Sequence, residues 1–594
     1  MRTERQDDGP RRVDRKVWLA LVVAAIPFAA ALAGLSRHHW FLTGDWASID
    51  LRVREVGTRD TPLVGPYSTH GWAHPGPLLY WLAAPLHRLS GGIAQSLSWT
   101  AAIVNLVALA VIARVGARRV GTGFAVAALV FASIAAHGIG PGRIVDIWNP
   151  LLPLFPLLAV CVLAWSGATG DRRHAAGALV LAAAVGQAHV GMIPVVGLVG
   201  VWAVGWWLVV QRPAERAEAG TETDSSGAAP RRERWRWPLA SALAAAVVLW
   251  LPPVLDQVWG QANLTTLYEY FTGGTGQSVG LRRGVGLVSR YVRPDGPWLG
   301  GAEPNVFGSV IGSGALPVLA LALALAVLAV LAWRRGDRLV AAGTSQALFL
   351  VLGAGAIAAK IEEPVWDYLV KWLIMVACWA WLWVAWGAWC LVRGHLPSGV
   401  RAKALPVALV GLFLVACWSV PAALRLPFPA GGSAPAVEAI RPRLERRLDK
   451  DRIIRIEHRG DDLGEIASGV IYWLWRDGYR VVSSDGSIGD KYGPDVAWHE
   501  GDPDGGAVYT VAVHFPGRFR DVLRECSKHP GARLVASYHQ LGAADRQWLE
   551  DFQVRNLFDP GSISSADVAR SDRLSERDLS VEVWKARDVC ASGA

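Results

Sequence analysis

Charged residues are scarce in this chain of 594 residues. Asp, Glu, Lys and Arg make up 18% of it, whereas 52% is hydrophobic and the mean hydropathy is +0.28. A soluble globular protein of this size usually carries more charge and fewer apolar residues. The composition therefore predicts a chain that lies mostly in lipid. Basic loops explain the net charge of +9, so no nucleic-acid partner is expected.

Several sequence motifs are also missing. No Walker phosphate loop is present, so we do not expect direct use of nucleoside triphosphates. No internal repeat is evident, whereas transporters often carry paired repeats. No tight ligand spacing such as a His-x-x-x-His pair supports a metal site, although a divalent cation is compatible with the sequence. No cofactor is therefore predicted.

Cysteine is rare as well, with six residues in the chain. Four of them fall in apolar runs, where cysteine behaves as a small buried hydrophobe. Cys526 and Cys590 lie in the C-terminal tail, and the topology predicted below places that tail in an oxidising compartment that would permit a disulfide between them.

Eleven apolar runs have about the length of 20 residues that crosses a hydrocarbon core of roughly 30 Å. An odd number of spans places the two termini on opposite sides of the membrane. The first run has a basic flank but no small-residue cleavage pattern, so we expect it to stay as an anchor. The predicted spans cover residues 17–35, 93–113, 121–137, 148–165, 175–188, 190–210, 238–255, 314–333, 338–358, 369–392 and 404–424.

Lys and Arg gather in alternate connections, which orients the chain because cytoplasmic loops collect basic residues. The basic tail 1–16 and the long connection 211–237, with its Arg cluster, fall on that side together with four short basic loops. We therefore predict a multi-pass protein of the plasma membrane whose membrane domain covers 17–424 and whose N-terminus is cytoplasmic. Its external loops are residues 36–92, 256–312 and 359–368.

A second domain follows the last span. Proline and glycine in residues 425–436 indicate a linker, and residues 437–594 have ordinary soluble composition. This extracytoplasmic domain carries no catalytic motif, so we expect acceptor binding, positioning or stability from it. Its pattern is that of a small α/β or α+β domain. Strands are predicted at 452–458, 479–483, 508–515, 533–538 and 579–585, and helices at 436–450, 463–476 and 517–528.

Asp45 lies just beyond the first span. Ile49, Val53 and Val56 recur at helical spacing opposite polar residues, which predicts an amphipathic helix on the membrane surface with Asp45 at its N-terminus. Helix capping is the plain explanation for an acid at that position. The alternative is a carboxylate held at the entrance of a membrane-level cavity.

A second group of unusual residues follows in the same loop. The run 65–77 mixes turn formers with Trp72 and His74, and a second surface helix is predicted at 78–89. Loops of this composition often carry function, although a packed turn with a hydrogen-bonded histidine also fits.

The whole layout resembles a GT-C fold membrane glycosyltransferase. The run Gly-Trp-Ala-His-Pro-Gly-Pro-Leu at 71–78 is similar to one found in bacterial proteins near the protein O-mannosyltransferase and aminoarabinose transferase families. Many members carry Asp-Glu after the first span, where this chain has Asp45 and Trp46. The resemblance implies an α-helical membrane domain of about eleven spans with an external C-terminal domain. It also implies inverting transfer of a sugar from a polyprenyl phosphate to a glycan, lipid or protein acceptor.

That reaction requires a base for the acceptor hydroxyl, and Asp45 is our candidate. Asp50 is a second candidate near the substrate, although it could instead orient Arg52 or Arg54. Departure of the lipid phosphate requires positive charge. The residues that could supply it are Arg143, Lys360, or Arg282, Arg283, Arg290 and Arg293.

Each of these positions also has a plainer explanation. Lys360 could pair with Glu362 or Glu363, and Arg143 with Asp146. His189 is a candidate for lining the cavity, for which a hydrogen bond between helices is the alternative. A transporter or flippase of lipid-linked sugars and a noncatalytic envelope assembly protein stay open as other functions. Trp72 and His74 complete the predicted substrate-binding residues.

Overall fold

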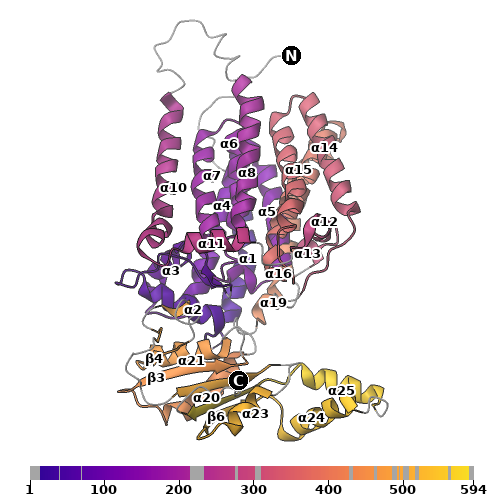
Figure 1. Ribbon diagram of the computed structural model, residues 1–594. Helices are drawn as coiled ribbons and strands as arrows, with labels where there is room; N and C mark the ends of the chain where they lie inside the picture. Colours follow the sequence, from indigo (N-terminus) through magenta and orange to yellow (C-terminus); the bar gives the residue numbers. More distant parts are fainter. Residues whose placement is uncertain are drawn as a thin grey trace.

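The computed structural model places a bundle of long helices on top of a smaller domain that contains a β-sheet (Figure 1). The chain follows this order, so the sheet domain is built from its C-terminal part. The structure describes residues 14–38, 40–68, 70–214, 233–273, 278–300, 309–426, 433–460, 465–484, 491–493, 496–498, 508–515, 521–558 and 563–586.

Each of the eleven predicted spans coincides with a helix of the bundle. Within the described residues, nine helices are long and apolar enough to cross a membrane, which confirms an integral membrane domain. The bundle helices are α1 (Arg15–Leu35), α4 (Gln95–Arg119), α5 (Thr122–Ile139), α6 (Leu154–Ala168), α7 (Arg172–Ala188), α8 (Met192–Trp206), α10 (Glu233–Trp259), α14 (Leu316–Arg334), α15 (Arg338–Ala358), α17 (Trp372–Val392) and α18 (Ser398–Trp418).

The other two bundle helices are shorter than these nine. Helix α6 has 15 residues and α7 has 17. All residues of α6 are buried, because α4, α7, α8 and α17 pack around it. The apolar run at 148–165 thus reflects burial inside the protein and not contact with lipid along its whole length.

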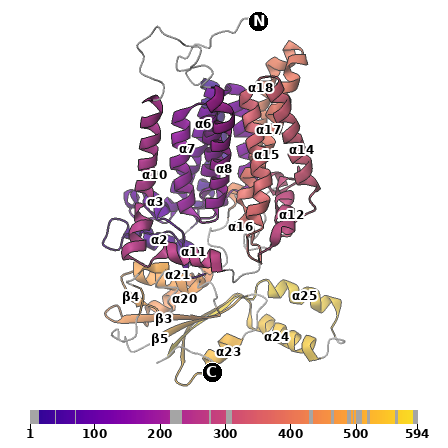
Figure 2. The same ribbon diagram turned by 45° about the horizontal axis from the view of Figure 1, so that its top comes forward.

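Shorter elements gather at one end of the bundle, between it and the C-terminal domain (Figures 1 and 2). Helices are present at both positions predicted for surface helices, as α2 (Gly44–Glu55) and α3 (Leu78–Leu89). A small hairpin of β1 (Tyr67–Ser68) and β2 (Trp72–Ala73) lies between them in the chain. The other short elements are the 3₁₀ turn η1 (Arg143–Val145), α11 (Asn263–Gly273), α12 (Gly280–Val292), α13 (Pro297–Gly300), α16 (Asp367–Val370) and α19 (Val420–Leu424).

The C-terminal domain is a mixed sheet covered by helices. Its strand order is β4-β3-β5-β7-β6, with β3 parallel to β4 and β5, and β7 antiparallel to β5 and β6. All five strands were predicted, whereas the hairpin of α24 and α25 was not. The elements are α20 (Ala434–Glu445), β3 (Ile453–Arg459), α21 (Glu465–Arg476), β4 (Arg480–Val482), β5 (Val508–His514), α23 (Asp521–Lys528), β6 (Arg533–His539), α24 (Ala543–Phe558), α25 (Ser565–Ser575) and β7 (Ser580–Ala586).

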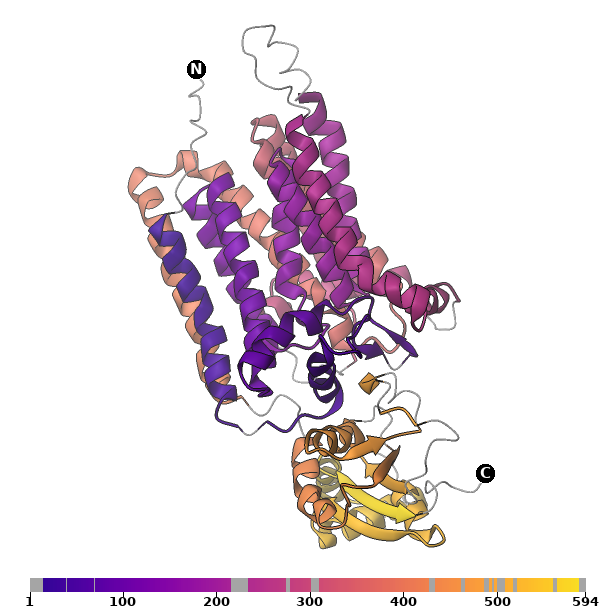
Figure 3. The same ribbon diagram turned by 90° about the vertical axis from the view of Figure 1, so that its left-hand side faces the viewer.

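Helix α21 packs on α2 and joins the two domains (Figure 2). Figure 3 shows the same arrangement from the side, with the orange domain below the indigo segments that follow α1. A Cβ atom at Gly469 of α21 would lie 2.7 Å from Cγ2 of Thr43, so the two backbones approach closely there. The polar face of α2 is therefore covered by protein, whereas we had predicted a helix on the membrane surface.

The predicted disulfide concerns two cysteines of this domain. Cys526 is disulfide-bonded. Cys590 lies outside the described residues. The four cysteines of the bundle are free, as expected for residues in apolar spans.

Candidate functional site

Asp45 lies in the first turn of α2, at the end of the bundle that faces the C-terminal domain. Gly44 begins the helix with a φ of +56°, a backbone conformation that glycine adopts at little cost. The Thr43 side chain makes no capping hydrogen bond. Both carboxylate oxygens of Asp45 bind groups from other elements, so the capping explanation does not account for this acid.

Two tryptophans cross-link Asp45 and Asp146. Trp148 Nε1 donates to Asp45 Oδ2 at 2.9 Å, and Trp46 Nε1 donates to Asp146 Oδ1 at 2.8 Å. Asp146 also accepts from the backbone N–H of Trp148 at 2.9 Å. Trp148 thus binds the acid that precedes Trp46 in sequence, and Trp46 binds the acid two residues before Trp148. The loop 36–92 and the turn around η1 are thereby fixed to each other.

Burial changes the acidity of Asp146. Removal of the carboxyl from water raises its pKa to about 6, and the negative charge of Asp45 acts in the same direction. The hydrogen bonds from Trp46 and Trp148 and the nearby Arg143 oppose this change. Asp146 therefore gains or loses its charge close to neutral pH, which is unusual for an aspartate.

A lysine from the C-terminal domain completes the surroundings of Asp45. Lys491 Nζ lies 2.9 Å from Asp45 Oδ1. On the other side, the ring of Tyr368 from α16 lies 5.1 Å from the ring of Trp148. Asp45 nevertheless keeps 37% of its side chain exposed, so its carboxylate stays accessible.

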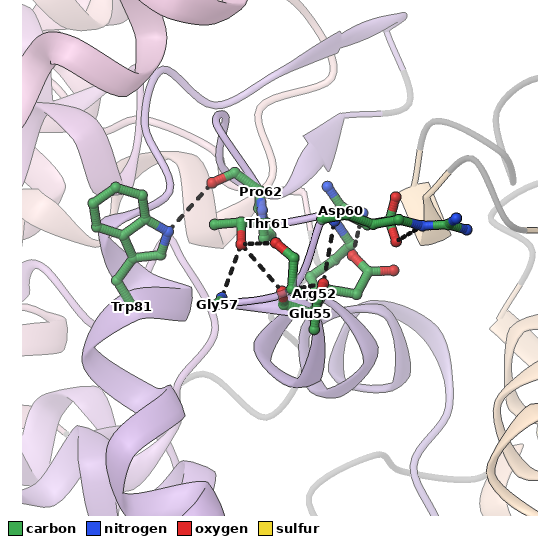
Figure 4. A network of polar contacts seen from close by, with 9 residues as sticks. Arg52, Glu55, Gly57, Asp60, Thr61, Pro62 and Trp81 are labelled. Atoms are coloured by element: carbon green, nitrogen blue, oxygen red, sulfur yellow. Dashed lines mark hydrogen bonds and ion pairs between the residues drawn. The ribbon is translucent and has the colours of Figure 1, made fainter.

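Helix α2 is braced at its other end. The Thr61 hydroxyl accepts from the Gly57 N–H at 2.8 Å and donates to the Glu55 carbonyl at 3.3 Å (Figure 4). Trp81 of α3 donates to the Pro62 carbonyl at 3.2 Å. These bonds tie the turn after α2 to α3, which fixes the direction of α2 and hence the place of Asp45.

Asp50 lies one and a half turns further along α2 and is fully buried. Its Oδ2 accepts from Arg54 Nε at 2.7 Å and from the Tyr472 hydroxyl at 3.0 Å. Nε2 of His87 lies 3.7 Å from Oδ1. These partners correspond to the alternative that Asp50 orients Arg54, and they make it a link between α2 and α21.

Trp72, His74 and His189 form a second group. The rings of His74 and His189 lie 4.4 Å apart, and the Trp72 ring lies 5.2 Å from His74. His74 Nδ1 accepts from the backbone N–H of Val190 at 3.2 Å. Burial and the neighbouring His189 hold the pKa of His74 well below its ordinary value, so its ring is neutral at pH 7.

Tyr270 connects this second group to the loop after α15. Its ring lies 5.6 Å from that of Trp72, and its hydroxyl donates to Glu362 at 2.9 Å. Glu363 pairs with Arg283. Both glutamates that could have neutralised Lys360 thus have other partners. Within the described part of the chain, no ion pair involves the exposed Lys360 ammonium.

The sequence did not identify Lys491, and it gave Asp146 only the role of a partner for Arg143. Asp146 precedes Trp148-Asn149-Pro150 in a short loop, and that position close to an indole was the available signal. The described residues contain no group of three or more His, Cys, Asp or Glu side chains that could hold a metal ion.

Comparison with known proteins gives a fold and no family. No family model and no curated protein matches the sequence. The crystal structure of ArnT from Cupriavidus metallidurans bound to undecaprenyl phosphate is similar, with 12% identity, a TM-score of 0.54, and 87% of this chain and 96% of that chain covered.

Two further structures are also similar. For ArnT in the apo state the identity is 14%, the TM-score is 0.53, and 88% of this chain and 97% of that chain are covered. An oligosaccharyltransferase from Archaeoglobus fulgidus has 10% identity and a TM-score of 0.45, with 95% of this chain and 88% of that chain covered. The likeness to ArnT extends over both domains and confirms the predicted GT-C fold.

Proposed function

We propose that this protein is a membrane glycosyltransferase that moves a sugar from a polyprenyl phosphate to an acceptor of the cell envelope. The observation that carries the proposal is the exposed carboxylate of Asp45, which an indole and an ammonium hold at the end of a GT-C bundle. The positive-inside pattern supports an assignment of this end and the C-terminal domain to the outer side of the plasma membrane.

The chemistry assigned to Asp45 is that of a general base. Its two oxygens have four lone-pair positions, of which Trp148 and Lys491 occupy one on each oxygen. An acceptor hydroxyl can therefore donate to Asp45 and lose its proton while the oxygen attacks the anomeric carbon from the side opposite the phosphate. The anomeric bond to phosphate breaks in the same step, and the configuration inverts.

The donor class is proposed from two observations. The similar ArnT structure holds undecaprenyl phosphate, which is a polyprenyl phosphate. In this chain, an apolar cavity of about 540 Å³ lies between α6, α7, α8 and α10, and is lined by alanine, glycine and branched aliphatic residues together with Trp207 and Trp250. It reaches Gly186, three residues before His189, so a prenyl chain in it would end near the second group of residues. We assign the phosphate to Lys360 and Arg143, and contacts with the sugar to Trp72, His74 and His189.

Transfer of labelled sugar tests the proposal. The purified protein in lipid nanodiscs is incubated with polyprenyl-phosphate sugars and a panel of glycan, lipid and peptide acceptors. We expect transfer by the wild type, loss of at least about 100-fold in Asp45→Asn, and wild-type rates in Asp60→Asn, which alters an acid of the same loop. Equal rates in wild type and Asp45→Asn would remove Asp45 as the base.

The same assay addresses the other functions. If no protein transfers sugar across the whole panel, flipping of a fluorescent lipid-linked sugar between leaflets is measured next. Movement that depends on the protein would favour a flippase, and its absence a noncatalytic assembly protein.

A further inference from the structure

Lys491 reaches Asp45 from a different domain, 446 positions further along the chain. Its ammonium lies 2.9 Å from Asp45 Oδ1, and its side chain is 12% exposed. The pair therefore differs from the mobile ion pairs of protein surfaces, which are usually worth about 0–1 kcal/mol. A lysine that is mostly buried against one carboxylate has few other positions available.

The residues after Lys491 fix it in place. Tyr492 is buried, and Gly493 has a φ of +102°. A Cβ atom at Gly493 would lie 2.5 Å from Arg52 Nη1 and 2.9 Å from Glu55 Oε1, so this glycine packs directly on the ion pair of α2. Gly493 thus packs on the last turn of α2, while the Lys491 side chain reaches Asp45 in the first turn. The contact at Gly493 thereby positions the ammonium next to Asp45.

The charges around Asp45 give the ammonium a function. Asp146 is close enough that the negative charge of Asp45 affects its acidity, and the remaining neighbours of Asp45 are the indole of Trp148 and the phenols of Tyr80 and Tyr368. Lys491 supplies positive charge at Asp45, as Arg143 does near Asp146, and both oppose repulsion between the two acids. Lys491 also fixes Oδ1, as Trp148 fixes Oδ2.

We propose that Lys491 is a positioning residue of the transfer site, and that the C-terminal domain is for this reason a part of the catalytic centre. This inference rests on the proposed function. Lys491 holds the carboxylate of Asp45 in the orientation that receives the acceptor proton. Misplacement of a reacting group by 1 Å can cost about 100-fold in rate, so loss of one of its two anchors has a large effect.

The geometry is tested without any substrate. A water-soluble carbodiimide activates a carboxylate, and a neighbouring amine displaces the urea to form an amide, with no spacer between the two residues. Applied to the full-length protein in nanodiscs, it should join Asp45 to Lys491, seen by mass spectrometry as a cross-linked peptide pair. Lys491→Arg and Asp45→Asn should lack this product. Its absence from the wild type would overturn the inference.

The role is tested by kinetics. Lys491→Gln should lower kcat for transfer at least about tenfold and leave the KM for the donor within about twofold, and Lys491→Arg should restore most of the rate. Tyr472→Phe weakens the same domain interface at Asp50 and spares Lys491, so it should keep most of its kcat. Lys528→Gln removes an exposed lysine of the same domain and should behave as wild type.

The outcomes separate the two proposals. A normal kcat in Lys491→Gln, or equal losses in Lys491→Gln and Tyr472→Phe, would overturn the positioning role while transfer by the wild type upholds the proposed function. Absence of transfer in the wild type would overturn the proposed function, and the role of Lys491 with it.

Discussion

Trp46 and Trp148 bind each other's neighbouring acids, with their ring centroids 5.8 Å apart. The two residues are 102 positions apart in sequence. A buried indole N–H requires an acceptor, and a carboxylate in a dry site requires donors, so the arrangement satisfies both. It also holds Asp45 and Asp146 at a fixed separation, because neither acid can turn without breaking a bond to an indole.

Trp148→Phe should therefore reduce transfer while the fold survives. Phenylalanine keeps most of the packing against Tyr368 but removes the hydrogen bond to Asp45. A hydrogen bond to a charged group is worth about 1.5–3 kcal/mol, so we expect kcat to fall about 10- to 100-fold. Trp18→Phe, which alters an exposed tryptophan of α1, is the control. Unchanged kcat in Trp148→Phe would show that Asp45 does not need this anchor.

Asp50→Asn should destabilise the protein. Asparagine leaves Arg54 without its carboxylate partner in a site where Asp50 is fully buried. Removal of one member of a buried pair costs about 3–5 kcal/mol, so the temperature of unfolding in detergent should fall by several degrees. Arg59→Gln breaks an exposed pair with Asp60 and should change it little. Similar melting of both variants would contradict the structural role of Asp50.

The sequence predicted the helices well because the apolar runs and the helical spacing that indicate them lie within short stretches of the chain. Apolar runs gave the positions of the bundle helices, and the spacing of Ile49 and Val53 gave α2. Which face of a helix is buried depends on neighbouring elements that can lie far away in sequence. The buried α6 and the lipid-facing α14 have similar apolar patterns, and the cover on the polar face of α2 depends on how α21 docks.

The candidate site was predicted in part for the same reason. Asp45 could be found because it follows the first span. His74 and His189 were chosen separately, and the structure brings their rings together. Lys491 could not be found, because it stands in a polar stretch without helical or strand periodicity. Its contact with Asp45 arises from the docking of two domains, which no pattern within either domain encodes.

Asp146 should make stability depend on pH. Its pKa is about 6 in the folded protein and near 3.8 in an unfolded chain, so the folded state binds the proton more tightly. Its contribution to the free energy of unfolding is thus largest below about pH 4 and falls by about 3 kcal/mol in all as the pH rises from about 4 to just above 6. Asp146→Asn cannot titrate but still accepts from Trp46.

The measurement compares the two proteins by thermal unfolding in detergent between pH 4.5 and 7.5. The variant should gain stability relative to the wild type as the pH rises from 4.5 to about 6, and the difference should level off above about pH 6. A difference in unfolding temperature that stays constant across this range would contradict an elevated pKa for Asp146.

Gly469→Ala should loosen the domain interface. The new Cβ would lie 2.7 Å from Cγ2 of Thr43 and 3.1 Å from Cγ2 of Val437, and both neighbours are β-branched side chains with little freedom to move. We expect faster hydrogen–deuterium exchange of the amides in α2 and α21. Gly542→Ala, where a Cβ meets nothing within 4 Å, is the matched control. Equal exchange in the two variants would contradict close packing of α21 on α2.

Lys360→Gln should weaken donor binding. Glu362 and Glu363 bind Tyr270 and Arg283, so the exposed ammonium of Lys360 is available for a phosphate. A charge-assisted contact is worth about 1.5–3 kcal/mol, which predicts a rise of at least about tenfold in the KM for the polyprenyl-phosphate donor and little change in the KM for the acceptor.

Lys360→Arg keeps the charge and should bind the donor nearly as well. Lys403→Gln, which removes a lysine on the predicted cytoplasmic side, should leave both constants unchanged. If Lys360→Gln and Lys403→Gln give the same donor KM as the wild type, the phosphate is held elsewhere, and Arg143 beside Asp146 becomes the residue to test.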